Sequence, residues 1–184
     1  MSDAKTYWDN RYSETPFACS KAPSPFLARY WSQLEKGKCL DIGMGEGANA
    51  VYLAQKGFQV KGFDISGVAV EHANKLARET GVTIEAKQAD LDLFLMGLME
   101  YETIIMTHFK PSVIRYYNEI VRALKQGGTL LVEAPTTDDL KEIIRPGEEH
   151  RDHYYKSNEL LQNLQGMKIL YYSEMEDPDQ PGRK

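Results

Sequence analysis

The sequence is poor in cysteine and lacks long apolar runs. Its 184 residues include two cysteines, Cys19 and Cys39, too few for the disulfide framework that stabilises small secreted proteins. Cys39 lies in an apolar run, so we expect a buried thiol there and not a nucleophile. The apolar stretch 91–99 is far too short to span a membrane, and residues 1–5 are polar, unlike a signal peptide. We therefore expect a cytoplasmic protein without a membrane partner.

The sequence also lacks an excess of positive charge. Lys and Arg number 22 against 27 Asp and Glu, which gives a net charge of −5 and no basic footprint for a polyanion. This balance disfavours a nucleic-acid substrate and favours a small molecule or another protein. Hydrophobic residues at 42% and charged residues at 27% are ordinary for a globular chain, and the length suits one α/β domain. The sequence leaves a monomer and a homodimer equally open.

From residue 38 onward, short apolar or β-branched runs alternate with amphipathic helical stretches. This alternation is typical of βαβ units, and it predicts a three-layer, doubly wound α/β fold with a mostly parallel sheet. We expect strands at 38–42, 59–64, 83–88, 102–107, 129–133 and 167–175, and helices at 48–56, 66–79, 112–125, 137–144 and 157–165. Residues 1–37, with two further helices expected near 6–13 and 26–34, are expected to form an N-terminal cap or lid. The domain itself is expected at 38–176. Residues 177–184 contain no apolar side chain and are expected to be disordered.

A glycine-rich loop joins the first expected strand to the following helix. It reads Asp41-Ile42-Gly43-Met44-Gly45-Glu46-Gly47. Backbone N–H groups and the positive end of the helix dipole would face a ligand there, and glycine lets that ligand approach the main chain. Gly43, Gly45 and Ala48 also satisfy a relaxed dinucleotide pattern, so an NAD-dependent oxidoreductase remains an alternative.

Three acidic residues stand at the ends of expected strands. Asp41 precedes the loop, where a carboxylate would repel a pyrophosphate and attract a cationic amino group. Asp64 ends the second strand, the position at which nucleotide-binding α/β folds place an acid for the ribose hydroxyls. Asp90 follows the third strand and could accept the amine of an adenine beside Leu91, although it could equally be a simple turn residue.

Several of these segments together resemble the motif series of class I S-adenosylmethionine-dependent methyltransferases. The resemblance covers residues 38–135 and rests on 41–47, Phe63-Asp64-Ile65-Ser66, Gln88-Ala89-Asp90-Leu91 and Gly127-Gly128-Thr129-Leu130-Leu131. The opening Tyr7-Trp8-Asp9-Asn10-Arg11-Tyr12 and the short length are similar to the small-molecule branch that includes tellurite-resistance and thiol methyltransferase-like proteins.

The resemblance implies where S-adenosylmethionine would bind. The methionine moiety would lie beside Asp41, Gly43, Gly45 and Gly47, the ribose on Asp64, and the adenine between Ile65 and Leu91 with Asp90 on its amine. Thr107 would also border the cofactor. Trp8, Arg11 and Tyr12 would fold over it together with Tyr7, with Arg11 a candidate for the methionine carboxylate.

Two features depart from the family pattern. The family usually completes its sheet with a seventh, antiparallel strand, which is not evident in this sequence. The segment Thr107-His108-Phe109-Lys110-Pro111 also lacks the Asn/Asp-Pro-Pro-aromatic motif of enzymes that methylate base amines, which disfavours such a reaction.

The expected reaction is an in-line displacement at a sulfonium methyl group, in which the protein mainly aligns the reactants and excludes water. A thiol, a chalcogen oxyanion or a similar acceptor would need little activation. His108, which follows the fourth strand, is the best-placed candidate for a general base. We expect no metal: His150 and His153 lie in a polar run without an evident third ligand. A non-catalytic cofactor-binding or regulatory module is a further alternative.

Overall fold

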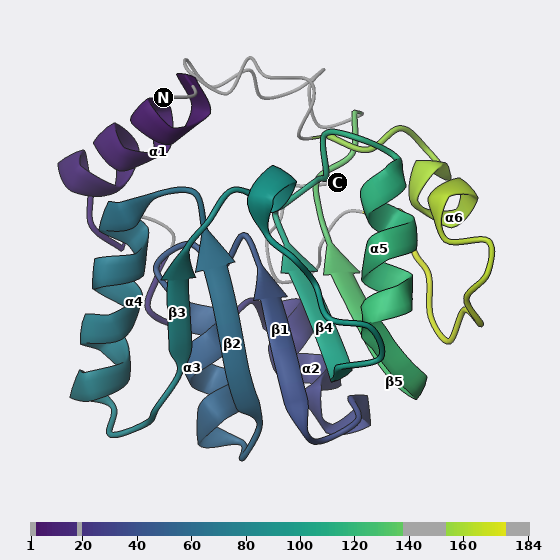
Figure 1. Ribbon diagram of the computed structural model, residues 1–184, viewed down its shortest axis with the longest axis horizontal. Helices are drawn as coiled ribbons and strands as arrows, with labels where there is room; N and C mark the ends of the chain where they lie inside the picture. Colours follow the sequence, from purple (N-terminus) through teal and green to yellow (C-terminus); the bar gives the residue numbers. More distant parts are fainter. Residues whose placement is uncertain (1–2, 18–19, 138–153, 176–184) are drawn as a thin grey trace.

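The computed structural model describes residues 3–17, 20–137 and 154–175, and its centre is a five-stranded parallel sheet (Figure 1). The strands are β1 (Lys38–Ile42), β2 (Gln59–Asp64), β3 (Glu85–Gln88), β4 (Tyr101–Thr107) and β5 (Leu124–Glu133). Their order across the sheet is β3-β2-β1-β4-β5, and each neighbouring pair is parallel. The chain therefore runs outward from β1 in both directions, as in a doubly wound fold.

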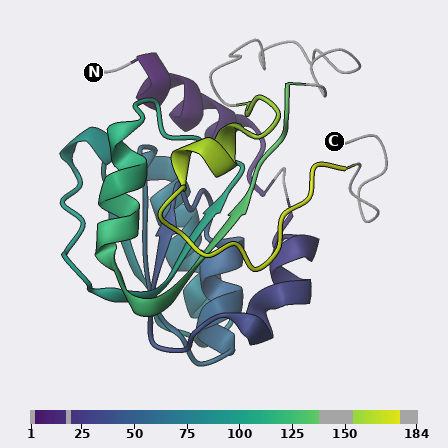
Figure 2. The same ribbon diagram turned by 90° about the vertical axis from the view of Figure 1, so that its right-hand side faces the viewer.

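Helices cover both faces of the sheet, which makes three layers (Figures 1 and 2). Helices α2 (Pro25–Tyr30), α3 (Ala48–Gln55) and α4 (Gly67–Glu79) pack on one side, and α5 (Arg115–Ala123) packs on the other. Short 3-10 turns follow α2 at η1 (Trp31–Gln33) and β3 at η2 (Leu91–Leu93). The last helix, α6 (Glu159–Asn163), lies beside α5 (Figure 1).

The core follows from the two-residue alternation of strand side chains. Leu40 and Ile42 of β1 contact the α5 side, whereas Cys39, which precedes Leu40, contacts the side of α2 and α3. All three side chains are completely buried. Continuous burial of this kind on both faces is expected for the central strand of a parallel sheet.

The N-terminal helix α1 (Asp3–Glu14) stands at the end of the sheet where the strands finish and packs against α4 (Figure 1). The Asp9 carboxylate accepts a hydrogen bond from the Ser66 hydroxyl at 2.6 Å. Ser66 is also the N-cap of α4, with its hydroxyl oxygen accepting the Ala69 N–H at 3.2 Å. The N-terminal helix is thus tied to the beginning of α4.

The predicted fold class and the first five strands are confirmed, with shifts at their ends. The fifth strand is longer than predicted because it continues back to Leu124, which pairs with Tyr101 across an irregularity in the register. The helix predicted at 26–34 divides into α2 and η1. The predictions at 138–153, including most of one helix, and at 177–184 lie outside the described residues.

The sixth strand predicted at 167–175 is wrong, because the chain there forms neither a strand nor a helix. Apart from Met167, which packs against the core on the α5 side, its large apolar side chains are exposed: Leu170 is 70% exposed and Tyr171 52% exposed. The Tyr171 ring instead contacts the rings of Phe26 and Tyr30 on α2. Glu174 accepts hydrogen bonds from Ser157 and Asn158 near the start of α6, and these hold the segment as a coil.

The outer edge of β5 pairs with no other strand within the described parts of the chain. The seventh strand of the family pattern is likewise absent from these residues. Within the same ranges, no helix has the length and apolarity needed to cross a membrane.

Candidate functional site

A cavity of about 1830 Å³ lies where the strands end. Every strand contributes to its wall or to the turn that follows it: Gly43 after β1, Asp64 at the end of β2, Asp90 after β3, Thr107 at the end of β4 and Glu133 at the end of β5. Ligands of open α/β sheets bind at this end, beside the strand pair from which the chain winds in opposite directions. Here that pair is β1 and β4.

The glycine loop forms one wall, and its backbone conformation requires glycine. Gly43, Gly45 and Gly47 have φ angles of 67°, 53° and 81°. A Cβ atom on Gly43 would lie 2.5 Å from the Phe109 ring, and one on Gly45 would lie 3.0 Å from the Tyr12 hydroxyl. Gly43 and Gly45 line the cavity. Gly47 instead packs against Ala73 of α4, so the structure gives it a role in helix packing.

Asp64 organises the backbone beside the loop. Its two carboxylate oxygens accept the N–H groups of Gly45 and Ser66, each at 2.9 Å. Burial raises its pKa, and these backbone hydrogen bonds oppose the rise. Asp64 is 7% exposed and lines the cavity. A carboxylate has about four acceptor positions, so the two backbone bonds leave capacity for ribose hydroxyls.

Asp41 lies beneath the loop and is completely buried. Neither of its carboxylate oxygens has a hydrogen-bond partner among the described residues. Burial, and secondarily the negative charge of Asp64, raise its pKa to about 8. Asp41 does not line the cavity, and with a pKa of about 8 it is mostly protonated at neutral pH, so it offers a ligand neither a direct contact nor a full negative charge.

The predicted adenine side is assembled from β2, β3 and the turn after β3. Ile65, Asp90 and Leu91 all line the cavity. Asp90 also caps the η2 turn, since its carboxylate accepts the Asp92 N–H at 3.1 Å. The turn interpretation and the ligand interpretation of Asp90 are therefore compatible.

Helix α1 brings its aromatic residues to the same cavity. Trp8, Arg11 and Tyr12 are half-buried and line it, and the Trp8 and Tyr12 rings stack with centroids 5.6 Å apart. Because the Tyr12 hydroxyl lies next to Gly45, α1 reaches the loop directly. Tyr7 lines the cavity as well, so the structure brings together all four N-terminal residues that the resemblance singled out.

The end of β4 carries the predicted base. His108 has a positive φ of 54°, uncommon for a residue other than glycine, and its N–H donates to the Glu133 carbonyl at 2.7 Å. Its side chain is exposed and lines the cavity. Thr107 is nearly buried, and its hydroxyl oxygen accepts a hydrogen bond from Asn49 at 2.7 Å.

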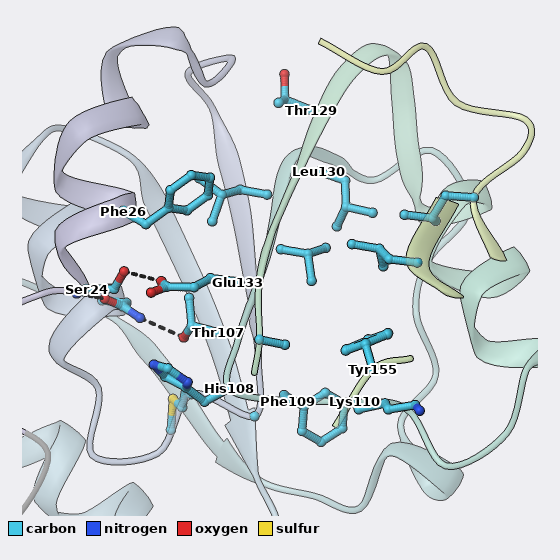
Figure 3. A pocket seen from close by; sticks show the side chains of 18 of the residues that line it. Ser24, Phe26, Thr107, His108, Phe109, Lys110, Thr129, Leu130, Glu133 and Tyr155 are labelled. Atoms are coloured by element: carbon cyan, nitrogen blue, oxygen red, sulfur yellow. Dashed lines mark hydrogen bonds between the residues drawn. The ribbon is translucent and has the colours of Figure 1, made fainter. Parts of the chain in front are cut away.

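Sequence reasoning missed three polar residues around Thr107. Ser24 donates its N–H to the Asn49 side-chain oxygen at 2.8 Å, and its hydroxyl donates to the Glu133 carboxylate (Figure 3). All three line the cavity. Only Glu133 had a detectable signal, a charged residue ending an apolar strand at the carboxyl edge of the sheet.

Six further aromatic residues occupy three different places in the structure. Tyr154, Tyr155 and Phe109 line the cavity, and the Tyr155 hydroxyl lies 2.8 Å from that of Tyr117. Tyr116 and Tyr117 are buried in the core under α5. Phe17 instead stacks on His72, away from the cavity.

Other sequence predictions concern reactive and metal-binding residues. Cys39 is buried as expected, and burial raises its pKa well above the ordinary value, which makes it a poor nucleophile. Cys19, His150 and His153 lie outside the described residues. Within the described ranges, no three His, Cys, Asp or Glu side chains gather in a way that could hold a metal.

Comparisons with known proteins agree with this geometry. Residues 39–128, from β1 to the glycines of β5, match the family described as methyltransferase domain. The chain carries an S-adenosylmethionine-dependent methyltransferase domain. S-adenosylmethionine is the cofactor of this domain, and the glycine loop with Asp64 beside it lies at the end of the sheet where nucleotide-like ligands bind.

Individual relatives of this methyltransferase domain span different parts of the chain. A 2-heptyl-1-hydroxyquinolin-4(1H)-one methyltransferase from Mycobacteroides abscessus is 35% identical over 52% of this chain and 45% of its own length. A solved structure concerned with conversion of a disulfide bond into a thioacetal group during echinomycin biosynthesis is 25% identical, with a TM-score of 0.68, over 87% of this chain and 77% of its own. TehB from Haemophilus influenzae shares the fold, with a TM-score of 0.71 and 19% identity, over 96% of this chain and 63% of its own. The chain spans less than half the length of the first curated relatives that it matches.

Proposed function

We propose that this protein transfers the methyl group of S-adenosylmethionine to a small-molecule acceptor by in-line displacement, with a thiol or a chalcogen oxyanion as the candidate class. The observation that carries the proposal is one cavity that reaches the carboxyl ends of all five strands and continues along β5, with residues 124–134 in its wall. Its volume of about 1830 Å³ exceeds the roughly 300 to 1000 Å³ usual for one small ligand, so a cofactor and an acceptor fit side by side.

The proposal assigns the half of the cavity nearest β1, β2 and β3 to the cofactor. Gly43 and Gly45 would adjoin its methionine part, and the positively charged cofactor would favour the ionised form of Asp41 below the loop. Asp64 would hold the ribose, and Ile65, Leu91 and Asp90 would hold the adenine. When bound, the cofactor supplies an electrophilic methyl group on a positively charged sulfur.

The N-terminal residues 1–37 are proposed as a cap over this half. Trp8, Arg11 and Tyr12 on α1 would cover the cofactor and exclude water from the methyl group. Thr107 would border the cofactor, and His108 remains a candidate base because it lines the cavity at the end of β4. The small-molecule acceptor is supported by the Mycobacteroides abscessus relative, which is named for a hydroxyquinolinone.

Calorimetry with S-adenosylhomocysteine and NAD tests the assignment of the cofactor. We expect S-adenosylhomocysteine to bind and NAD not to bind. Formation of S-adenosylhomocysteine is then followed with thiols, chalcogen oxyanions, amines and carboxylates as acceptors. Binding without turnover of any acceptor would support the regulatory-module alternative. Preferential binding of NAD would overturn the proposal.

A further inference from the structure

The part of the cavity beyond β4 has a polar floor that, apart from Thr107, the cofactor assignment leaves unused. Ser24, Asn49 and Thr107 form a hydrogen-bonded row that ends at the Glu133 carboxylate (Figure 3). One oxygen of Glu133, Oε2, accepts the Ser24 hydroxyl. Among the described residues, its other oxygen, Oε1, accepts no hydrogen bond. Glu133 therefore presents an acceptor of hydrogen bonds, and a negative charge, on the wall of the cavity.

The wall next to this floor is aromatic. The rings of Phe26 and Tyr30 on α2 lie 4.8 Å apart, and Tyr171 from the C-terminal coil lies 5.1 Å from Tyr30 and 6.1 Å from Phe26. All three residues line the cavity. Figure 3 places Phe26 close to Ser24 and Glu133, so the apolar wall and the carboxylate border the same space.

The cations near this space offer little attraction to an oxyanion. Lys110 lines the cavity, but its ammonium group pairs with Glu159 at 2.8 Å and donates to the Tyr154 carbonyl at 2.9 Å. Arg29, on the same helix as Phe26, also lines the cavity but is exposed to solvent, which screens its charge. A divalent chalcogen oxyanion placed at Glu133 would therefore be repelled by that carboxylate, while of these two described cations one is already paired and the other is exposed.

We infer that the methyl acceptor is a neutral molecule with an apolar or aromatic body and a protic head, such as a thiol, whose body lies on Phe26, Tyr30 and Tyr171 and whose head donates to Glu133. This inference rests on the proposed function and narrows it, since it selects a thiol over an oxyanion. Glu133 is then a catalytic residue that both orients the head and receives its proton.

The proton and electron balance of the transfer is complete with these groups. The head atom uses a lone pair to form a bond to the methyl carbon. The carbon–sulfur bond of the sulfonium breaks, and its electron pair stays on sulfur to give a neutral thioether. The proton of the head passes to the Glu133 carboxylate, so no oxidant, reductant or metal is required.

The alternative role for Glu133 is purely structural, because its bond to Ser24 ties α2 to β5. The matched pair Glu133→Gln and Ser24→Ala separates the two roles. Both substitutions remove or weaken the tie, but Ser24→Ala keeps the carboxylate. A structural role predicts equal effects, whereas our inference predicts that only Glu133→Gln greatly lowers kcat.

The experiment uses the full chain with S-adenosylmethionine and three probe acceptors: benzyl mercaptan, 2-mercaptoethanol and selenite. We expect kcat/KM for benzyl mercaptan to exceed that for 2-mercaptoethanol by at least about 10-fold, because an aromatic body gains burial on the aromatic wall. No turnover of selenite is expected. Glu133→Gln should lower kcat for benzyl mercaptan by about 100-fold, the scale of lost general base catalysis, and Ser24→Ala by less than about 3-fold.

Tyr171→Ala tests the aromatic wall without disturbing the core, because Tyr171 is half exposed. We expect its KM for benzyl mercaptan to rise about 10-fold while the parameters for 2-mercaptoethanol stay nearly constant. Three results would overturn the inference. The first is a preference for selenite, and the second is an equal loss of kcat in Glu133→Gln and Ser24→Ala. The third is no turnover of benzyl mercaptan together with no binding of it to the S-adenosylhomocysteine-loaded protein. Calorimetry with S-adenosylhomocysteine keeps the two proposals apart: if it binds normally, only the acceptor assignment has failed, and if it does not bind, the proposed function itself fails.

Discussion

The carboxylate of Asp9 on α1 and the hydroxyl of Ser66 at the start of α4 lie 2.6 Å apart, in a hydrogen bond that joins the N-terminal helix to the body of the domain. The same hydroxyl group caps α4. Hydrogen bonds from Lys5 and Ser66 lower the pKa of Asp9, so its carboxylate is charged at neutral pH. The proposed cap is therefore held at a helix N-terminus, where a negative charge is favourable.

Asp9→Ala should weaken cofactor binding although Asp9 does not line the cavity. Loss of a charged hydrogen bond costs about 1.5 to 3 kcal/mol. Part of that free energy stabilises α1 in its position against α4, from which it covers the cavity. We expect the Kd for S-adenosylhomocysteine to rise about 10-fold and amide exchange across α1 to accelerate. The exposed Asn10→Ala on the same helix is the control. Faster exchange of α1 without a change in Kd would show that α1 does not cover the cofactor.

Asp64→Ala should weaken binding of S-adenosylhomocysteine by about 1.5 to 3 kcal/mol. The Gly45 N–H loses its carboxylate partner, and the ribose loses the acceptor assigned to it. Calorimetry measures the effect, and thermal unfolding of the same variant shows whether the domain remains folded. Affinity within twofold of the parent protein would remove Asp64 from the cofactor site.

Gly47→Ala should destabilise the domain by more than about 2 kcal/mol. A Cβ atom at this position would lie 2.6 Å from the Ala73 Cβ, and its φ of 81° is unfavourable for alanine. Gly57→Ala is the matched control, because φ there is 90° and nothing lies within 4 Å of the added atom. Its cost should be the backbone strain alone, about 1 kcal/mol. Equal losses in urea unfolding would contradict packing of Gly47 on α4.

Asp41→Asn should change how stability depends on pH. The folded protein raises the Asp41 pKa from 3.8 to about 8, so folding favours the protonated form. The contribution of protonated Asp41 to the free energy of unfolding is complete below about pH 4. It declines as pH rises toward 8, by up to about 1.4 kcal/mol per pH unit. Asparagine cannot ionise, so the variant should lose this decline and be more stable than the parent at pH 8. Urea unfolding at pH 5 to 8 checks this, with exposed Glu71→Gln as the control; an unchanged slope would contradict it.

The sequence predicted most of the sheet because its strands carry strong local signals. Gly57 and Gly81 mark the helix ends, and the apolar runs of β1, β2 and β4 have no alternative to burial. The segment at 167–175 carries the same β-forming residues, but a strand also needs a neighbour with which to pair. The Tyr171 ring contacts Tyr30 of α2 instead. The local sequence around Tyr171 does not indicate this tertiary contact.

The candidate site divides in a similar way. Gly43, Gly45 and Asp64 could be predicted because their spacing along one βαβ unit determines where they lie. Ser24, Asn49 and Glu133 come from three separate elements that meet only in the folded chain. Ser24 reads as an ordinary helix cap, and that role is real, since its hydroxyl oxygen accepts the Leu27 N–H. Its second bond, to Glu133, depends on tertiary packing.

The position of β5 at the edge of the sheet affects how easily this strand opens locally. Strand β1 is flanked by β2 and β4, whereas β5 shares its ladder with β4 alone among the described residues. Local opening of β5 therefore breaks one row of hydrogen bonds, where opening of β1 breaks two. The other edge strand, β3, borders the proposed cofactor side and likewise pairs with one neighbour, β2, so both ends of the cavity can open at lower cost than its centre.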